Sequence, residues 1–436
     1  MEQTNCKAPV RADRNQTNIT KERFRNLMGV IVSLLVASST SASLTSAIML
    51  QMSAVEAVTT TPVRKVATSS LEAIAQRNTV VSMIPAEPAV NTKVSQTSES
   101  SLAETQSTAT ERLQLPVPQF TVVARLPRFG EGVVFDREGR LYVSDSFDNS
   151  ILRISETGEA QVWARVFSPN GHKVLANGIH VVLEQGEQGG AVAYLDPDGQ
   201  VIQRITTDDP GRRLRYPNDI ALDLQNGGFY FTDPGLFMAN EPGRVYYVDV
   251  QGSIRTVSDN GIDFSNGIVL RPDGQTLLVG ESLQNRVLEF RVPSPGRIER
   301  SRVFATLPSQ PNPWTNGEAE PDGMTLDESG NLYVAHFGAG VVRVFDPSGR
   351  LLGSLGSGTA TITNLAFGGP DLNELYIYGA NGTSLEEVED ARIVRLTLPG
   401  VRGLPLFPPA GELTGQNTHG NAGSRSTRYA RSQHSF

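Results

Sequence analysis

The sequence is poor in the residues that build disulfides, thiolate metal sites and nucleic-acid surfaces. Its one cysteine, Cys6, precedes the apolar segment near the N-terminus, so the rest of the 436-residue chain can hold neither a disulfide nor a cysteine-ligated zinc ion. The net charge is -8, and no basic run is longer than Arg212-Arg213. Nucleic-acid surfaces need clustered lysine and arginine, so we expect no nucleic-acid partner. Any metal must be bound by oxygen or imidazole.

The sequence also lacks an amphipathic helix and the signatures of several common catalytic sites. It contains no Gly-x-Ser-x-Gly, no His-Glu-x-x-His and no glycine-rich phosphate loop, which argues against a serine hydrolase, a zinc peptidase and a P-loop enzyme. It contains instead short β-branched and aromatic runs, separated by turn dipeptides such as Asp198-Gly199, Asp273-Gly274 and Ser348-Gly349. This pattern is typical of strands joined by hairpins.

The strongly apolar segment near the N-terminus has the order of a secretory signal. Lys21, Arg23 and Arg25 precede an uncharged stretch, 26–54, whose apolar heart, 27–37, is followed by small residues. A membrane-spanning helix needs about 20 predominantly apolar residues, which is more than this heart supplies. We therefore expect residues 1–54 to be a signal peptide that exports the protein to the periplasm or the outside, with an uncleaved membrane anchor as the alternative.

The flanks of the remaining chain have a composition that does not support a packed core. Residues 55–112 are rich in serine and threonine with scattered charge, and residues 411–436 are polar. Such segments bury too little apolar surface to order themselves. We expect a disordered linker at 55–112, one folded domain at 113–410 and a disordered tail at 411–436.

A repeat in this domain predicts its architecture. One phrase recurs six times, beginning GEGVVFD, PNGHKVL, PNDIALD, SNGIVLR, PDGMTLD and TNLAFGG, and an apolar position follows at a constant distance in every copy. Repeats at blade-sized spacing predict an all-β, six-bladed β-propeller, and we expect the strand TVVARLP ahead of the first copy to complete the last blade. The second residue of each phrase contributes to what we call the channel ring: Glu131, Asn170, Asn218, Asn266, Asp322 and Asn364.

The channel ring predicts a metal site. The first strand of each propeller blade lines the central channel, so equivalent residues at the starts of these strands meet at one face. Two carboxylates and four amides crowded there would be poorly solvated without a cation. Oxygen donors that include neutral amides favour Ca²⁺, with Zn²⁺, Mg²⁺ or Mn²⁺ as alternatives. We predict that Glu131, Asn218, Asn266 and Asp322 bind one divalent ion, whereas Asn170 and Asn364 suit turns at least as well.

Four of the phrases, RFGEGVVFD, YPNDIALD, FSNGIVLRPDG and EPDGMTLDESGNLYVA, occur in an order that resembles the gluconolactonase, senescence-marker protein (regucalcin) and luciferin-regenerating family. The resemblance implies a six-bladed propeller with one catalytic metal, bound by the same four residues, and hydrolysis of lactones or esters. One position departs from the sugar-lactone members, because Tyr216 stands where they commonly carry an arginine that grips substrate hydroxyls. This departure argues against a sugar acid lactone.

These residues suggest a mechanism in which a divalent ion polarises the carbonyl of a small lactone or ester and a carboxylate accepts the proton of the attacking water. We predict Asp322 as this base, with Glu131 second, and Asn170, Tyr216 and His336 as substrate contacts. A buried structural histidine is the alternative for His336. The insertion 308–320 carries Trp314, which either faces substrate or packs on the surface. Two other functions remain open: a non-catalytic calcium-binding propeller that binds a ligand or partner, and an organophosphate hydrolase.

Overall fold

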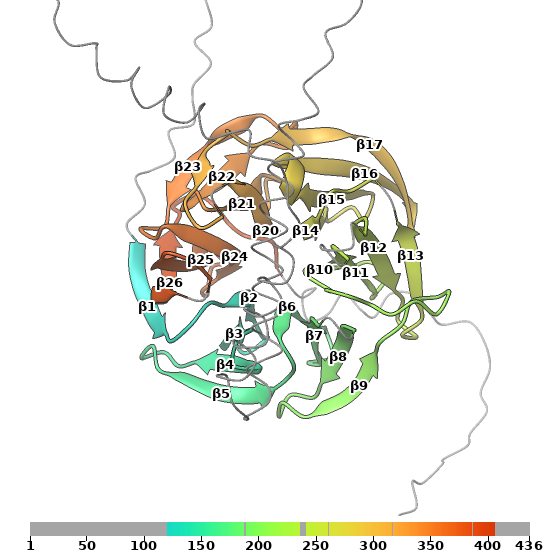
Figure 1. Cartoon of the computed structure of the whole chain (residues 1–436), viewed down its shortest axis with the longest axis horizontal. Coiled ribbons are helices and arrows are strands. Elements are labelled where there is room, and N and C mark those ends of the chain that lie inside the picture. Colours follow the sequence, from blue (N-terminus) through green and yellow to red (C-terminus); the bar gives the residue numbers. More distant parts are fainter. Residues whose placement is uncertain are drawn as a thin grey trace, which may run out of the picture. The chain divides into compact units, whose positions relative to one another are not determined.

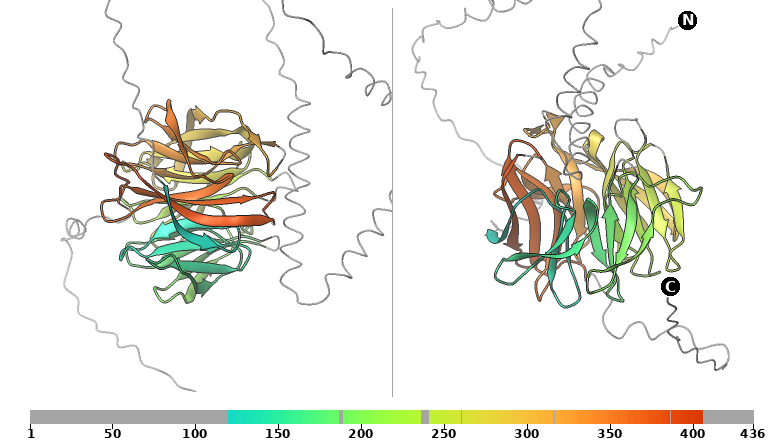
Figure 2. Two further views of the ribbon diagram at one scale, coloured as in Figure 1. Left: turned by 90° about the vertical axis from the view of Figure 1, so that its left-hand side faces the viewer. Right: turned by 60° about the horizontal axis from the view of Figure 1, so that its bottom comes forward.

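The computed structural model describes residues 120–405, except 187–188, 236–240, 260, 316 and 386. Six four-stranded antiparallel sheets surround a common centre (Figure 1), which confirms the predicted six-bladed all-β propeller. The strands of each blade run from one face to the other (Figure 2). No helix among the described residues is long and apolar enough to cross a membrane. The predicted signal, linker and tail lie outside the described residues.

Each blade starts with its innermost strand, and the following strands lie progressively further out. Blade 1 contains β2 (Glu131–Phe135), β3 (Leu141–Asp145), β4 (Ser150–Ile154) and β5 (Ala160–Arg165), and blade 2 contains β6 (Pro169–Val174), β7 (His180–Glu184), β8 (Ala191–Leu195) and β9 (Val201–Ile205). Blade 3 contains β10 (Ile220–Leu222), β11 (Phe229–Asp233), β12 (Arg244–Val248) and β13 (Ile254–Ser258), and blade 4 contains β14 (Ser265–Leu270), β15 (Thr276–Glu281), β16 (Arg286–Ser294) and β17 (Arg297–Thr306). Blade 5 contains β20 (Glu320–Leu326), β21 (Leu332–Phe337), β22 (Val341–Phe345) and β23 (Leu351–Gly356).

Blade 6 joins the two ends of the domain. It contains β24 (Thr361–Gly368), β25 (Glu374–Gly382) and β26 (Val388–Thr397), and its outermost strand is β1 (Phe120–Leu126) from the start of the domain. The register pairs Phe120 with Leu396 and Leu126 with Ala391. This pairing confirms that the segment before the first repeat completes the last blade. A short hairpin of β18 (Pro311–Asn312) and β19 (Gly317–Glu318) lies between blades 4 and 5. Within blade 4, a 3-10 turn, η2 (Ser282–Gln284), follows β15.

An aspartate five residues after the channel ring position explains part of the repeat. Asp136 and Asp327 occupy this position in blades 1 and 5, at the turn after the innermost strand. The carboxylate of Asp136 accepts a hydrogen bond from the hydroxyl of Tyr142 at 3.0 Å, and that of Asp327 accepts one from Tyr333 at 3.2 Å. A buried tyrosine needs such a partner for its hydroxyl. The repeated aspartate therefore joins the inner hairpin of the blade to its apolar core.

A buried histidine pair in blade 2 packs against blade 1. His172 Nε2 lies 2.8 Å from His180 Nδ1, and the ring of Trp163 packs on His180 with centroids 4.4 Å apart. Burial lowers the pKa of His180 to about 4, and burial together with the neighbouring His180 lowers the pKa of His172 well below its usual value. Both imidazoles are therefore neutral at pH 7.

This pair predicts a loss of stability in mild acid. Above about pH 6.5 His180 is neutral in both states, but between pH 6.5 and pH 4 only the unfolded chain binds its proton, so the free energy of unfolding falls by roughly 3 kcal/mol over this window. Urea unfolding of the native protein and of His180→Asn at several pH values measures the effect. The variant should show the smaller loss, and equal slopes would contradict the prediction.

Candidate metal centre

Backbone oxygens at three channel ring positions accept hydrogen bonds from the preceding blade. The backbone oxygen of Asn170 accepts a hydrogen bond from Ser144 Oγ at 2.7 Å, and that of Asn218 accepts one from the N–H of Gly171 at 2.7 Å. The backbone oxygen of Asn266 likewise accepts one from Thr232 Oγ1 at 2.7 Å. These bonds join blades 1 to 4 at the ring, and the electrostatic coupling of Glu131 with Asp322 places these two ring carboxylates near each other.

Glycine follows the channel ring residue in four blades because the neighbouring inner strand lies too close for a side chain. A Cβ atom at Gly132 would lie 2.3 Å from the backbone oxygen of Asn170, and one at Gly267 would lie 2.1 Å from that of Asp322. Real Cβ atoms do not approach oxygen so closely. The repeated glycine therefore allows six inner strands to converge on a narrow channel.

Irregular strand pairing interrupts the ladder at or directly after the ring residue in five blades. The register shifts between Glu131 and Val134 in β2, and between Pro321 and Met324 in β20. Corresponding shifts occur in β6, β14 and β24. Bulges of this kind redirect side chains and are frequent beside functional sites. The shift includes the ring position in four blades, and in blade 1 it begins directly after Glu131, which still pairs with Ser144.

The two ring carboxylates lie in an environment that disfavours their charge. Burial raises the pKa of Glu131 well above its usual value, and the negative charges of Asp322 and Asp219 raise it further. Burial likewise raises the pKa of Asp322, with further contributions from Glu320 and Asp219. Carboxyl groups that repel one another in a buried channel are stabilised in their charged form by a cation. The electrostatics therefore favour a bound metal.

The amide donors of the ring fit the same conclusion. The side chain of Asn266 hydrogen-bonds Asp322 and lowers its pKa, while its own Oδ1 is buried without a hydrogen-bond partner among the described residues. An orphaned buried oxygen beside two carboxylates suits a hard cation. Asn218 is also buried, 8% exposed, with its backbone N–H bound to the carbonyl of Thr232 at 2.8 Å. The residues present therefore fit an oxygen-bound divalent ion.

The described residues contain no group of three or more histidine, cysteine, aspartate and glutamate side chains arranged as a metal site. The proposed donor set has two carboxylates and two amides, so it does not form such a group. Geometry of this type favours calcium over zinc, because zinc usually takes nitrogen and sulfur ligands.

Asn364 has a structural role in the ring. Its Oδ1 accepts a hydrogen bond from the backbone N–H of Val133 at 3.3 Å, and its side chain also hydrogen-bonds Glu131. Asn364 thus links blade 6 to blade 1 and orients the carboxylate of Glu131. Its sequence context alone slightly favoured a turn over a ligand.

Two buried carboxylates beside the ring did not emerge from the sequence reasoning. Asp219 follows Asn218 where most blades have glycine, and its carboxylate accepts the backbone N–H groups of Ile220 at 2.8 Å and Ile268 at 3.3 Å. Glu320 precedes Asp322 by two residues, and burial raises its pKa to about 8. The repeat alignment carried the signal for Asp219, since a charged residue replaces glycine there.

The predicted substrate contacts lie in different settings. Asn170 is buried in the ring. Tyr216 is half-buried, and its backbone N–H is bound by Asp233 Oδ1 at 3.0 Å. His336 is fully buried, and its Nδ1 accepts a hydrogen bond from Nε of Arg343 at 3.1 Å. Burial and the charge of Arg343 lower the pKa of His336 to about 4, so it is neutral at pH 7. Substrate binding by these three residues stays a prediction.

Carboxylates at the ends of the second strands hold the connections between blades. Glu184 Oε1 accepts the backbone N–H of Phe167 at 3.1 Å, and Glu281 Oε1 accepts that of Asp263 at 2.7 Å. Both acceptors fix the chain just before it enters an inner strand. These carboxylates therefore position the ring indirectly.

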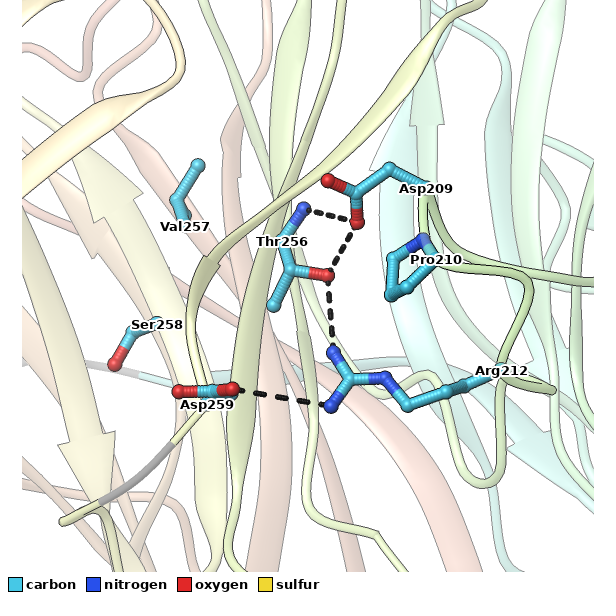
Figure 3. A pocket seen from close by; sticks show the side chains of 7 residues that line it. All are labelled: Asp209, Pro210, Arg212, Thr256, Val257, Ser258 and Asp259. Atoms are coloured by element: carbon cyan, nitrogen blue, oxygen red, sulfur yellow. Dashed lines mark hydrogen bonds and ion pairs between the residues drawn. The ribbon is translucent and has the colours of Figure 1, made fainter.

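A surface pocket of about 580 Å³ lies away from the channel, at the outer edge of blade 3 (Figure 3). There Asp209 Oδ1 accepts the backbone N–H of Thr256 at 3.1 Å and its hydroxyl at 2.8 Å, while Arg212 lies 3.8 Å from Asp259. Thr256 lies in β13, the outermost strand. The segment that carries Asp209 and Arg212 thus covers part of the outer edge of β13, and covering an unpaired sheet edge is common in β proteins.

The fold and the ring define a six-bladed propeller whose channel carries converging oxygen donors at one face. A match to the SMP-30/Gluconolactonase/LRE-like region extends over residues 129–381, and the chain belongs to this family. Among curated proteins, it is 30% identical over 230 residues to the lactonase drp35 of Staphylococcus aureus, covering 52% of this chain and 68% of the relative. It is 31% identical over 232 residues to the lactonase drp35 of Staphylococcus epidermidis, with the same coverage.

Solved structures show the same fold. A gluconolactonase from Xanthomonas campestris is 25% identical with a TM-score of 0.53, covering 65% of this chain and 91% of the other. A luciferin-regenerating enzyme is 24% identical with a TM-score of 0.55, covering 66% and 97%. The relatives named lactonase and gluconolactonase are hydrolases, the enzyme class that the sequence predicted.

Proposed function

We propose that this protein is a metal-dependent hydrolase of lactones or related esters. The observation that carries the proposal is the meeting of Glu131 and Asp322 in a buried ring beside Asn266 Oδ1, which has no partner among the described residues. Its family relatives named lactonase support the same reaction class. The replacement of the expected arginine by Tyr216 favours a flatter or more apolar lactone than a sugar acid lactone.

Glu131, Asn218, Asn266 and Asp322 are the residues that would hold the divalent ion, and calcium suits their oxygen atoms best. When bound, such an ion acts as a Lewis acid on the lactone carbonyl and stabilises the developing oxyanion. The structural neighbour named regucalcin is described as calcium-binding, although at 21% identity it supports only the fold.

The carboxylate of Asp322 is the proposed general base. Water attacks the lactone carbonyl carbon and transfers a proton to Asp322. When the bond from the carbonyl carbon to the ring oxygen breaks, Asp322 returns this proton to the leaving oxygen, and a hydroxy acid results. Asn266 and Asn364 hold the two carboxylates in position through their side-chain hydrogen bonds. Asn170 and Tyr216 are the proposed contacts for the rest of the substrate, and we propose that the protein acts after export.

A panel of lactones and aryl esters, assayed on the purified protein with and without a chelator, tests this function. We expect chelator-sensitive hydrolysis that calcium restores. Chelator-sensitive melting without turnover would instead indicate a calcium-binding propeller, and turnover of phosphotriesters alone would indicate an organophosphate hydrolase.

A further inference from the structure

The insertion between blades 4 and 5 is firmly attached at both ends. The N–H of Ala319 donates to the carbonyl of Gln310 at 2.7 Å, and the short hairpin pairs Asn312 with Gly317. Arg343, which is buried, donates one N–H to the side chain of Gln310 and another to His336. The insertion is thus fixed to the second and third strands of blade 5, and its tip carries Trp314.

Trp314 is buried, 3% exposed, within an apolar cluster that borders the channel ring. Its ring packs edge-on against Phe337 with centroids 6.3 Å apart, and Phe337 pairs with Glu320, two residues before Asp322. The same cluster contains Tyr378, whose Cε2 would lie 2.8 Å from a Cβ at Gly130, next to Glu131. The cluster therefore adjoins Glu131 and the inner strand that carries Asp322.

Two buried hydrogen-bond donors on this insertion have no partner among the described residues: Trp314 Nε1 and Asn312 Nδ2. The amide of Asn312 has a defined orientation, because its Oδ1 accepts the backbone N–H of Trp314 at 3.0 Å. Its NH₂ group therefore remains as the unused donor. Leaving a buried donor unsatisfied costs about 1 to 3 kcal/mol, so an acceptor supplied by a ligand would stabilise both donors of this short insertion.

We propose that Trp314 Nε1 and Asn312 Nδ2 form a specificity subsite that binds an uncharged carbonyl on the substituent of the lactone. The inference rests on the proposed function and names its substrate class: lactones with an amide or ester substituent. Both donors are neutral, and Trp314 lies in a cluster that also contains Phe337 and Tyr378. The charges of Asp145 and Glu131 act on Tyr378 and would repel an anionic group bound there. A neutral oxygen acceptor next to apolar atoms fits this setting, because it can accept the two hydrogen bonds and carries no negative charge.

The variant Trp314→Phe tests the subsite because it keeps an aromatic ring and removes the N–H. The probes are two γ-butyrolactones, one with an acetamido and one with an isobutyl substituent at the α position. We expect the native enzyme to prefer the acetamido lactone in kcat/KM, and the variant to lose roughly fivefold of this preference, the usual effect of one hydrogen bond. An unchanged ratio would overturn the proposal. Asn312→Asp removes the Nδ2 donor but keeps an oxygen that accepts the backbone N–H of Trp314. This variant should also reduce the preference for the acetamido lactone.

The chain has only two tryptophans, so the second provides a matched control and a binding signal. Trp163 packs between blades 1 and 2, against His180, and Trp163→Phe should keep the native substrate preference. In this full-length variant the emission of Trp314 alone reports binding. With calcium present, we expect the acetamido lactone to shift this emission immediately on mixing at concentrations where the isobutyl lactone has no effect. Equal responses, or none, would overturn the subsite.

The two hypotheses fail in different ways. Emission shifts without any lactone turnover would support the subsite and contradict the proposed function. Chelator-sensitive turnover without discrimination between the two lactones would support the function and contradict the subsite.

Discussion

Replacing Asp322 with alanine is expected to abolish lactone hydrolysis and to weaken metal binding in the same variant. Asp322 is proposed both as a ligand and as the base, and its buried carboxylate is hydrogen-bonded by Asn266. Losing a general base alone lowers the rate by about 10² to 10⁴, and losing a charged ligand also weakens the metal site. We therefore expect kcat/KM to fall by at least about 10³. Steady-state kinetics and calorimetric titration with calcium measure both effects.

The matched control is Asp273→Ala. Asp273 lies in an exposed hairpin turn of blade 4, where its carboxylate accepts the N–H of Gln275 at 2.8 Å, so its removal should change neither activity nor calcium affinity. Asp322→Asn separates the two roles, because an amide keeps an oxygen ligand but is no base. Hydrolysis by Asp322→Ala at the native rate would refute the assignment of both roles.

Deleting residues 113–126, which include β1, is expected to lower the free energy of unfolding by at least about 4 kcal/mol. The deletion removes the buried side chains of Ala124 and Leu126 and the hydrogen bonds between β1 and β26. Burial of one leucine contributes about 2 kcal/mol, and each hydrogen bond about 1 kcal/mol. The deletion also exposes the edge of β26. Urea unfolding followed by circular dichroism measures the loss.

Deleting the linker 55–112 is the control for this experiment. Its composition predicts no packed structure, so the midpoint of unfolding should remain at the native value. If the two deletions had similar effects, the closure of blade 6 by β1 would contribute little to stability, contrary to this account.

The sequence predicted the ring because the six copies of the repeat can be aligned position by position. The spacing of the six phrases placed Glu131 and Asp322 in equivalent positions, and the propeller geometry then required them to converge. The same comparison could have revealed Asp219, which replaces a glycine. It could not have revealed that Asn364 hydrogen-bonds the blade 1 strand, because that contact joins residues 231 positions apart.

The environments of individual side chains were beyond the reach of the sequence. His336 and Trp314 each had two interpretations from their neighbours in the chain. The structure buries both, places His336 against Arg343, and packs Trp314 on Phe337. The contacts between blade 5 and the insertion 308–320 do not recur at a fixed spacing in the sequence. The repeat therefore could not predict them.

The sequence by itself determined the number of blades, the position of each inner strand and the residue types at the start of each inner strand, because these depend on local strand chemistry repeated along the chain. Only the tertiary structure decided which carboxylates repel one another, which amide oxygen lacks a partner and which side chains surround the tip of the insertion. Those properties depend on distances between segments that are remote in sequence, and such distances are set when the six blades pack around their common centre.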